Sequence, residues 1–254
     1  MSEAVLVSKE NGVMIVTINR PEAKNAINKQ VAEGISAAMD ELDSSPDLQV
    51  AILTGAGGTF CSGMDLKAFL TGETPVVPGR GFAGICEKQP EKPVIAAIEG
   101  YALAGGFEIM LSCDLAVAAD NAKFGIPEVK RGLAAGAGGL LKMPSQMPYR
   151  IALEMALTGD FITAQRAYEV GLINRIVSAG TALEGAKALA EAIAANGPLA
   201  VLTSKKVMKA SLDWSSDEAF AKQAPMIAPV FTSEDAREGA AAFAQKRKPN
   251  WKGK

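Results

Sequence analysis

Residues 100–114 read GYALAGGFEIMLSCD, in which a pair of glycines precedes an apolar run that contains Glu108. The stretch 100–119 is the most apolar of the chain, and its length is close to that of a membrane span. It also contains Asp114, however, and a charged side chain at the centre of a bilayer costs roughly 3 kcal/mol. We therefore interpret the stretch as a helix beginning at Gly105 and a strand after it, both buried in a globular core, and we expect no membrane span.

Outward from this stretch, short apolar strands alternate with helical patterns. Two β-rich runs flank an Asn-Gly pair within residues 5–18, which predicts a hairpin with a type I′ turn. Apolar residues at helical spacing predict a helix over 27–42, ended by the Ser-Ser-Pro sequence at 44–46. Further strands are expected over 50–58, 93–100, 115–120, 122–126 and 173–177.

The C-terminal part of the chain is mostly helical. One helix is expected over 181–197, with Gly197 closing its C-terminus. Strands that alternate with helices up to about residue 190 are typical of an α/β core. We therefore expect an α/β core over residues 1–190 and a helical region over 191–254. Within the helical region, helices are expected near 198–212, 215–228 and 233–246.

The composition is that of a globular protein without histidine. The 254 residues are 48% apolar and 21% charged, with 26 Lys and Arg against 28 Asp and Glu. This near-neutral balance argues against non-specific binding to nucleic acid, which needs a basic excess. The absence of histidine excludes Ser-His-Asp catalysis, Cys-His catalysis and His-ligated zinc. Proton transfer would therefore have to come from carboxylates, Lys, Tyr or Cys.

The cysteines and the N-terminus bear on the compartment. Cys61, Cys86 and Cys113 form no C-x-x-C pair, and an odd number of cysteines gives no disulfide framework. We expect reduced thiols and no metal site, and we interpret Cys61 as a small buried hydrophobic residue rather than a nucleophile. The N-terminus, MSEAVLVSKENG, lacks the basic and apolar regions of a signal peptide. These features together predict a cytoplasmic protein.

Two glutamates are the candidate acid–base groups. Glu108 lies on the first turn of the helix described above, and Glu128 lies in FGIPEVKRGLAAGAGG, residues 124–139. Burial raises the pKa of a carboxyl group and a second carboxylate nearby raises it further, so such a pair can supply one acid and one base. Glu108 could equally be a helix-dipole partner. Glu128 could form a surface ion pair with Lys130 or Arg131, and the residues alone leave these alternatives open.

Together with FCSGMDLK at 60–67, the segments around both glutamates resemble the crotonase (enoyl-CoA hydratase/isomerase) superfamily in their order and spacing. The resemblance runs from NRPEAKNAI at 19–27 to SEDAREGAAAFAQKRKPN at 233–250. It implies an α/β fold, a crotonase-like spiral of ββα units with a helical C-terminal trimerisation region, assembled as homotrimers or hexamers. It also implies an acyl-CoA thioester as substrate, with no metal and no cofactor beyond the coenzyme A of the substrate.

The resemblance further implies roles for individual residues. Glu108 and Glu128 match the two carboxylates with which hydratases of the family hold and activate a water, and Gly136 matches a glycine that borders this water. The backbone N–H groups of Ser62 and Gly105 match the two donors of an oxyanion hole, and a helix N-terminus such as Gly105 has N–H groups free for an anion. The implied coenzyme A contacts are Lys24, Ala26, Ser62, Gly63, Met64, Asp65 and Gly105, with Phe243 and Lys246 from a neighbouring subunit.

The presence of both glutamates favours an enoyl-CoA hydratase, which adds water to a 2-trans-enoyl-CoA and gives a 3-hydroxyacyl-CoA. The alternatives within the resemblance are a Δ3,Δ2-enoyl-CoA isomerase and a specialised dehydratase of the carnitinyl-CoA kind. A non-catalytic acyl-CoA binder is the alternative outside enzymes. The wall of the acyl pocket is expected to come from residues 68–91. Its apolar candidates are Leu70, Val76, Val77, Phe82 and Ile85.

Overall fold

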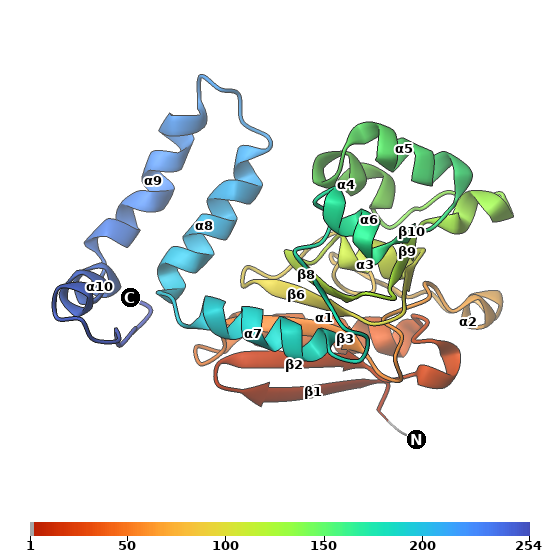
Figure 1. Ribbon diagram of the computed structural model, residues 1–254, viewed down its shortest axis with the longest axis horizontal. Helices are drawn as coiled ribbons and strands as arrows, with labels where there is room; N and C mark the ends of the chain where they lie inside the picture. Colours follow the sequence, from red (N-terminus) through yellow and green to blue (C-terminus); the bar gives the residue numbers. More distant parts are fainter. Residues whose placement is uncertain (1–2) are drawn as a thin grey trace.

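A computed structural model describes residues 3–254, and its centre is a six-stranded sheet with the order β1-β2-β3-β6-β8-β11 (Figure 1). Only β1 and β2 pair antiparallel, and the other neighbours run parallel. The predicted hairpin is confirmed, because Asn11 and Gly12 take φ angles of 49° and 79°, and a type I′ turn needs two positive φ angles. The strands of this sheet are β1 (Val5–Glu10), β2 (Val13–Ile18), β3 (Val50–Gly55), β6 (Val94–Ile98), β8 (Leu115–Ala119) and β11 (Arg175–Val177).

The strand residues alternate between two apolar layers, one on each face of the sheet. In β2, Met14 joins the layer that contains α1 (Lys29–Ser44), whereas Ile15 joins the layer that contains α7 (Ala182–Ala194). Each strand of the sheet interior is therefore apolar on both faces. This explains why these strands appear in the sequence as continuous apolar runs rather than as an alternating pattern.

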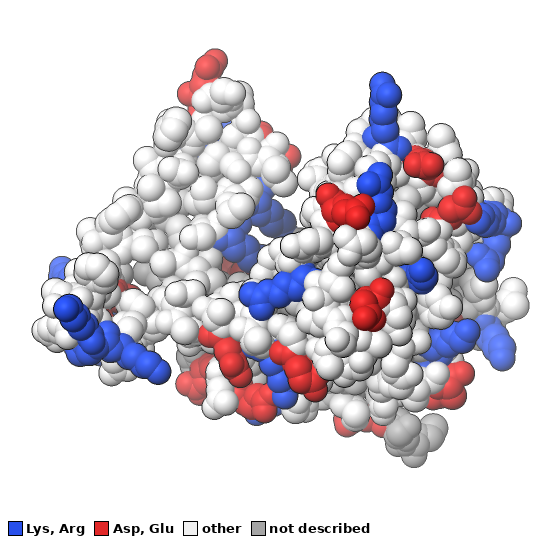
Figure 2. Space-filling view, viewed as in Figure 1, with Lys and Arg blue, Asp and Glu red and all other residues white. Residues whose placement is uncertain are grey.

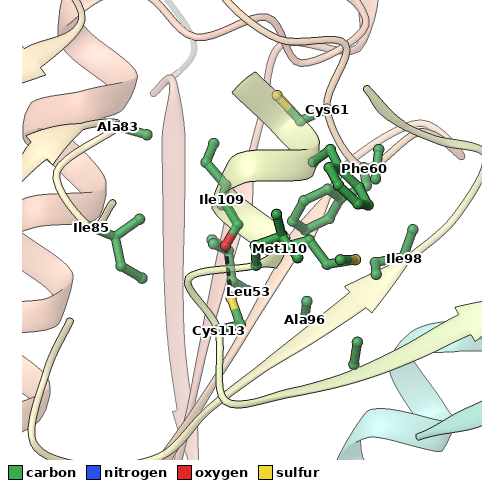
Figure 3. Close-up of a cluster of buried hydrophobic side chains, with 14 of the residues drawn as sticks. Leu53, Phe60, Cys61, Ala83, Ile85, Ala96, Ile98, Ile109, Met110 and Cys113 are labelled. Carbon is green, nitrogen blue, oxygen red and sulfur yellow. Dashed lines mark hydrogen bonds between the residues drawn. The ribbon is translucent and has the colours of Figure 1, made fainter. Parts of the chain in front are cut away.

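Figure 3 shows part of the α1-side layer, where side chains from β3 and β6 surround helix α3 (Gly105–Met110). Leu53 and Ile98 come from the two strands, and Ile109 comes from the helix. The Cys113 thiol donates to the carbonyl of Ile109 at 3.5 Å. Every residue of α3 is buried, so the helix that carries Glu108 is held by packing along its whole length.

At the ends of β6 and β8 the chain turns into a second sheet with the order β10-β9-β7. β7 (Tyr101–Leu103) follows β6 and leads into α3, while β9 (Lys123–Gly125) follows β8 and leads into the 3₁₀ helix η2 (Pro127–Arg131). The first of these turns is one ββα unit, and the second repeats its pattern with a 3₁₀ helix in place of the α-helix, as the predicted spiral of ββα units requires. The sequence did not predict β7 or β10 (Ile162–Thr163), because strands this short show no periodicity.

Several predicted helix boundaries are wrong, and the helix expected near 215–228 is α9 (Ala219–Thr232), four residues later at each end. α1 begins at Lys29 because the side chain of Asn28 caps it, accepting the N–H of Val31 at 3.0 Å. Gly197 does not close α7 but is the N-cap of α8 (Pro198–Ser211), where Pro198 takes the first helical position, a position that favours proline. The remaining elements are the 3₁₀ helix η1 (Pro21–Ala23), β4 (Val76–Val77), β5 (Gly81–Phe82), α2 (Leu66–Leu70), α4 (Gly139–Gln146), α5 (Tyr149–Thr158), α6 (Ala164–Glu169) and α10 (Glu234–Ala244).

The last three helices stand apart from the sheet. α7 lies across one face of the sheet, whereas α8, α9 and α10 project from one end of it (Figure 1). The chain end then returns to α10, where the carboxylate of Asp235 accepts the N–H groups of Lys252 and Gly253 at 2.7 and 2.9 Å. A division of the chain after residue 190 stays a prediction. Across residues 3–254, no helix has both the length and the hydrophobicity that crossing a membrane requires.

Candidate active site

The spiral brings the glycine-bearing segments together. β7 pairs in parallel with β9, and on its other side Ala102 forms an isolated parallel bridge with Cys61. Three extended segments therefore lie side by side, namely the one at Cys61, β7 and β9. They lead into residues 62–67, the start of α3 and the start of η2. Because the carboxyl ends of parallel segments lie at the same edge, the three gather at one edge of the second sheet.

Two of these segments touch through glycines. A Cβ added to Gly63 would lie 2.9 Å from the Cβ of Ala104 and 3.3 Å from the nitrogen of Gly105. A Cβ added to Gly105 would lie 2.6 Å from the ring of Phe82. Gly63 also has a φ of 108°, which L residues rarely adopt. The backbone of Gly63 therefore lies directly against the first N–H group of α3.

Two backbone N–H groups are free at this contact, those of Met64 and Gly105. Ile27 donates to the Gly63 carbonyl at 2.8 Å, and Asp65 donates back to the Ile27 carbonyl at 2.9 Å. In a parallel bridge of this pattern, the N–H of the residue in between points away from the partner segment. Among the described residues, neither the Met64 N–H nor the first N–H of α3 has a protein acceptor.

The prediction that Ser62 is an oxyanion-hole donor is wrong. Its backbone N–H donates to the carbonyl of Lys24 at 3.1 Å and is therefore occupied. Met64, predicted only as a coenzyme A contact, is the candidate donor in its place, opposite the predicted Gly105. The sequence could not show this, because the choice depends on which N–H groups the distant segment around Ile27 uses.

Ala104, the residue before α3, has a strained backbone. Its φ and ψ are 51° and −126°, a combination that costs an L residue about 1–3 kcal/mol. Its N–H donates to the Gly125 carbonyl at 2.8 Å, and its carbonyl accepts the Glu108 N–H at 3.1 Å. The bonds on both sides of the residue therefore hold it in this conformation, which orients the free N–H of Gly105.

Replacing Ala104 by glycine is expected to stabilise the protein by about 1 kcal/mol, because the released strain exceeds the extra freedom that glycine gives to the unfolded chain. Urea unfolding measures the change. Ala102→Gly in β7 is the matched control, since Ala102 is buried and has no positive φ, and it is expected to destabilise. Equal destabilisation by both variants would show that Ala104 is not strained.

Glu108 is held by a loop distant in sequence. Its side chain is almost fully buried, and Oε1 accepts the N–H groups of Ala137 at 2.7 Å and Gly139 at 2.9 Å. Burial raises the pKa of Glu108, and the two N–H donors oppose part of this rise. The carboxylate therefore has specific partners outside its own helix, and the helix-dipole alternative does not describe it.

Glu128 on η2 has a buried carboxyl oxygen, Oε2, without a hydrogen-bond partner. Burial raises the pKa of Glu128, although Arg131 opposes this rise, and the charge of Glu128 in turn raises the pKa of Glu108. Lys130 pairs with Asp160 at 2.6 Å, and within residues 3–254 Glu128 forms no ion pair. A buried carboxyl oxygen without a partner is suited to a bound water or a substrate atom.

The loop that holds Glu108 includes Gly136, which was predicted to border a catalytic water. A Cβ added to Gly136 would meet a single backbone oxygen at 3.9 Å, so the space beside it is open. Its contact with a water stays a prediction. The residues that bond to Glu108 are the following Ala137 and Gly139, which sequence reasoning missed. Gly138, which lies between them, has a φ of 103°. The only indication of this positive φ in the sequence is the repeated glycine of GAGG at 136–139.

Among the predicted coenzyme A contacts, Lys24 and Ala26 differ from Asp65, whose carboxylate is used within the protein. Lys24 is exposed, with Nζ 5.9 Å from the centre of the Tyr101 ring, and the buried Ala26 lies next to the bridge at Met64. Asp65 is used within the protein, where it pairs with Arg20 at 2.8 Å and caps α2. Burial opposes ionisation of Asp65, but the bond from Arg20 and two backbone N–H groups hold its pKa below the usual range.

Phe243 and Lys246 do not reach the site of their own chain. They lie on and after α10, at the end of the molecule opposite α2 and the segment 60–67 (Figure 1). The Phe243 side chain is 89% exposed. Their predicted contact with coenzyme A therefore depends on a second subunit.

The three cysteines are not nucleophiles, and only part of the predicted wall of the acyl pocket lies at the candidate site. All three cysteines are free and buried, which confirms the predicted burial of Cys61, and burial raises the pKa of the Cys61 thiol to about 12, far from that of a nucleophile. Ile85 was predicted to line the acyl pocket but lies fully buried in the core. Phe82 packs against Gly105, which places it at the candidate site.

Comparisons with known proteins cover the whole chain. Residues 8–254 match the family described as enoyl-CoA hydratase/isomerase. An enoyl-CoA hydratase of Mycobacterium tuberculosis is 42% identical, over 97% of this chain and 95% of that protein. A carnitinyl-CoA dehydratase of Proteus mirabilis is 40% identical over 100% of both chains. The crystal structure of another enoyl-CoA hydratase, from Mycobacterium tuberculosis H37Rv, matches with a TM-score of 0.98 and 57% identity over 100% of both chains.

Proposed function

Because this chain belongs to the enoyl-CoA hydratase/isomerase family, we propose that it is an enoyl-CoA hydratase, a hydro-lyase that adds water reversibly to a 2-trans-enoyl-CoA. One observation carries this choice within the family. The carboxylate of Glu108 is fixed by two N–H donors, and within its electrostatic reach Glu128 presents a buried oxygen that lacks a partner. A water between two such groups would find a base on one side and an acid on the other.

The two carboxyl groups take opposite roles in the proposed reaction. The N–H donors favour the ionised form of Glu108, which accepts a proton from the water as the water oxygen bonds to C3 of the enoyl group. Glu128, whose Oε2 has no donor, favours the protonated form and gives its proton to C2. Glu108 then carries a proton and Glu128 is ionised, and exchange with solvent restores both.

Between the two bond-forming steps, negative charge collects on the thioester oxygen. The free N–H groups of Met64 and Gly105 lie on the two segments that touch at Gly63, and we propose that they receive this oxygen. Loss of one such donor typically costs roughly 3 kcal/mol of transition-state stabilisation. The proposed steps use these protein groups and the coenzyme A of the substrate, with no further cofactor.

The direct test is the absorbance of the conjugated enoyl thioester in crotonyl-CoA. Hydration removes the conjugation, so the absorbance should fall with time and with enzyme concentration. If the protein instead raised this absorbance from a 3-enoyl-CoA and left crotonyl-CoA unchanged, it would be an isomerase. Binding of crotonyl-CoA without turnover would identify a non-catalytic acyl-CoA binder.

A second candidate is a dehydratase specialised for a substrate such as carnitinyl-CoA, because a full-length relative at 40% identity carries that name. The two candidates differ in the acyl group that the pocket prefers. Comparing kcat/KM for carnitinyl-CoA and 3-hydroxybutyryl-CoA separates them, and the hydratase proposal expects the second substrate to be preferred. We also propose a cytoplasmic location, since all three cysteines are free thiols.

We propose in addition that the chain assembles as a trimer or hexamer through α8, α9 and α10. The surface of these helices in Figure 2 carries few charged side chains, and several large apolar side chains are exposed there. Exposed apolar surface of this extent is typical of an interface. The exposed residues are Met208, Leu212, Phe220, Phe231 and Phe243.

Light scattering is expected to give a mass three or six times the chain mass of 26.4 kDa. Phe243 and Lys246 lie too far from the site of their own chain to contact coenzyme A there. In the proposed assembly they would instead reach the coenzyme A of a neighbouring subunit. A mass of 26.4 kDa at micromolar concentration would contradict both statements.

A further inference from the structure

A partly buried lysine lies behind Glu108 and has no role in the mechanism above. Lys142 is on α4, and its Nζ donates to the carbonyl of Cys86 at 2.6 Å and to the hydroxyl of Ser112 at 2.5 Å. Both acceptors are buried in the core below α3. A lysine that enters such surroundings loses hydration, so its placement needs compensating contacts.

The contacts of Lys142 lead to Glu108 along two routes. The Ser112 hydroxyl, which accepts from Lys142, donates in turn to the backbone carbonyl of Glu108 at 2.7 Å. Lys142 also lies one turn into α4, whose first residue, Gly139, donates to Glu108 Oε1 at 2.9 Å. One side chain therefore ties together the helix that carries Glu108, the loop that binds its carboxylate and the segment at Cys86.

We propose that Lys142 is a positioning residue for Glu108: its ammonium group holds the start of α4 against α3, and with it the Gly139 N–H group that binds the Glu108 carboxylate. The proposal rests on the proposed hydratase function, since it assigns Glu108 the role of base. Lys142 touches neither the substrate nor the reacting atoms in this arrangement and acts through Glu108 alone.

The charges around both groups agree with this role. Burial lowers the pKa of Lys142, and the groups that oppose this are Cys86, Cys113, Glu108 and Glu87. Burial raises the pKa of the Cys86 thiol to about 11 and that of Cys113 further, so both are neutral near pH 7. The negative charge facing Lys142 is therefore that of Glu87 and Glu108. On the other side, Glu128 raises the pKa of Glu108 and Lys142 lowers it.

The test compares Lys142→Met, Lys142→Gln and Lys142→Arg by single-turnover hydration of crotonyl-CoA as a function of pH. The acid limb of the profile is the part where the rate rises as Glu108 ionises. Loss of the Lys142 charge should raise the pKa of Glu108 and move this limb to higher pH, so that the rate at a fixed pH on the limb falls about tenfold. Glutamine keeps hydrogen-bond donors without the charge, so it should fold and show the same movement. Arginine keeps the charge and should restore the wild-type limb.

Lys205→Met is the matched control. Lys205 is also a largely buried anchor, donating to the carbonyls of Pro90 and Lys92 and to Asp114 at 2.7 Å, but unlike Lys142 it is not among the main influences on the pKa of Glu108. This variant should lose stability and keep the position of the limb. A limb that stays in place in both Lys142→Gln and Lys142→Met would overturn the proposal. Failure of the hydratase function itself would appear separately, as a wild-type protein that does not hydrate crotonyl-CoA at any pH.

Discussion

Replacing Glu108 by glutamine is expected to lower the turnover of crotonyl-CoA hydration by about 10²–10⁴-fold, the usual contribution of one acid–base group. The amide oxygen of glutamine can still accept the N–H groups of Ala137 and Gly139, so the loop should keep its place. What disappears is the ability to take a proton from water. The affinity for the acyl-CoA should therefore change little, which gives a lower kcat with a nearly constant KM.

Glu128→Gln is expected to have an effect of similar size, because it removes the proton that is delivered to C2. Glu99→Gln is the matched control for both variants. The Glu99 carboxylate also accepts two backbone N–H groups, from Gly180 at 3.0 Å and Ala182 at 2.8 Å, but it lies at the start of α7. Its replacement should leave turnover near the wild-type value. Near-normal activity in either the Glu108 or the Glu128 variant would remove that residue from the mechanism.

The fold could be predicted to the extent that single elements carry their own signals. The hairpin at Asn11-Gly12 and the apolar strands of the large sheet have clear local patterns, and the structure confirms them. The strand β7 (Tyr101–Leu103) has no such pattern, because its three residues owe their extended form to pairing with β9 and the bridge at Cys61. Gly197 was misassigned because a glycine between two helical patterns can end one helix or begin the next.

The site could be predicted only where residue type carries the chemistry. Glu108 and Glu128 stand out in the sequence because carboxyl groups are rare in apolar surroundings, and the structure places both at the candidate site. The backbone donors are different, since any residue has an N–H group. Whether the backbone N–H of Ser62 or that of Met64 is free depends on hydrogen bonds to residues 24–27, about 40 residues earlier, and no local pattern reports these bonds.

Replacing Gly63 by alanine is expected to lower turnover by about 10²–10³-fold, comparable to the loss of one oxyanion-hole donor. The new Cβ would lie 2.9 Å from the Cβ of Ala104 and 3.3 Å from the nitrogen of Gly105. Because Ala104 is held by hydrogen bonds on both sides, the contact cannot relax without moving the start of α3. The position of the Gly105 N–H relative to that of Met64 would then change, and kcat should fall more than the affinity for the acyl-CoA.

Backbone strain alone could also reduce activity, and Gly180→Ala separates this effect from the proposed one. Gly180 has a positive φ of 86°, like Gly63, but nothing lies within 4 Å of its added Cβ, and it precedes α7, far from the site in sequence. Both variants should lose about 1–2 kcal/mol of stability to the strained conformation. Only Gly63→Ala should also lose turnover in single-turnover measurements at a temperature where both proteins are folded. Both variants introduce backbone strain, but only Gly63→Ala adds a contact with Ala104 and Gly105. Equal activity of Gly63→Ala and Gly180→Ala would therefore show that the contact between Gly63 and Gly105 has no part in stabilising the oxyanion.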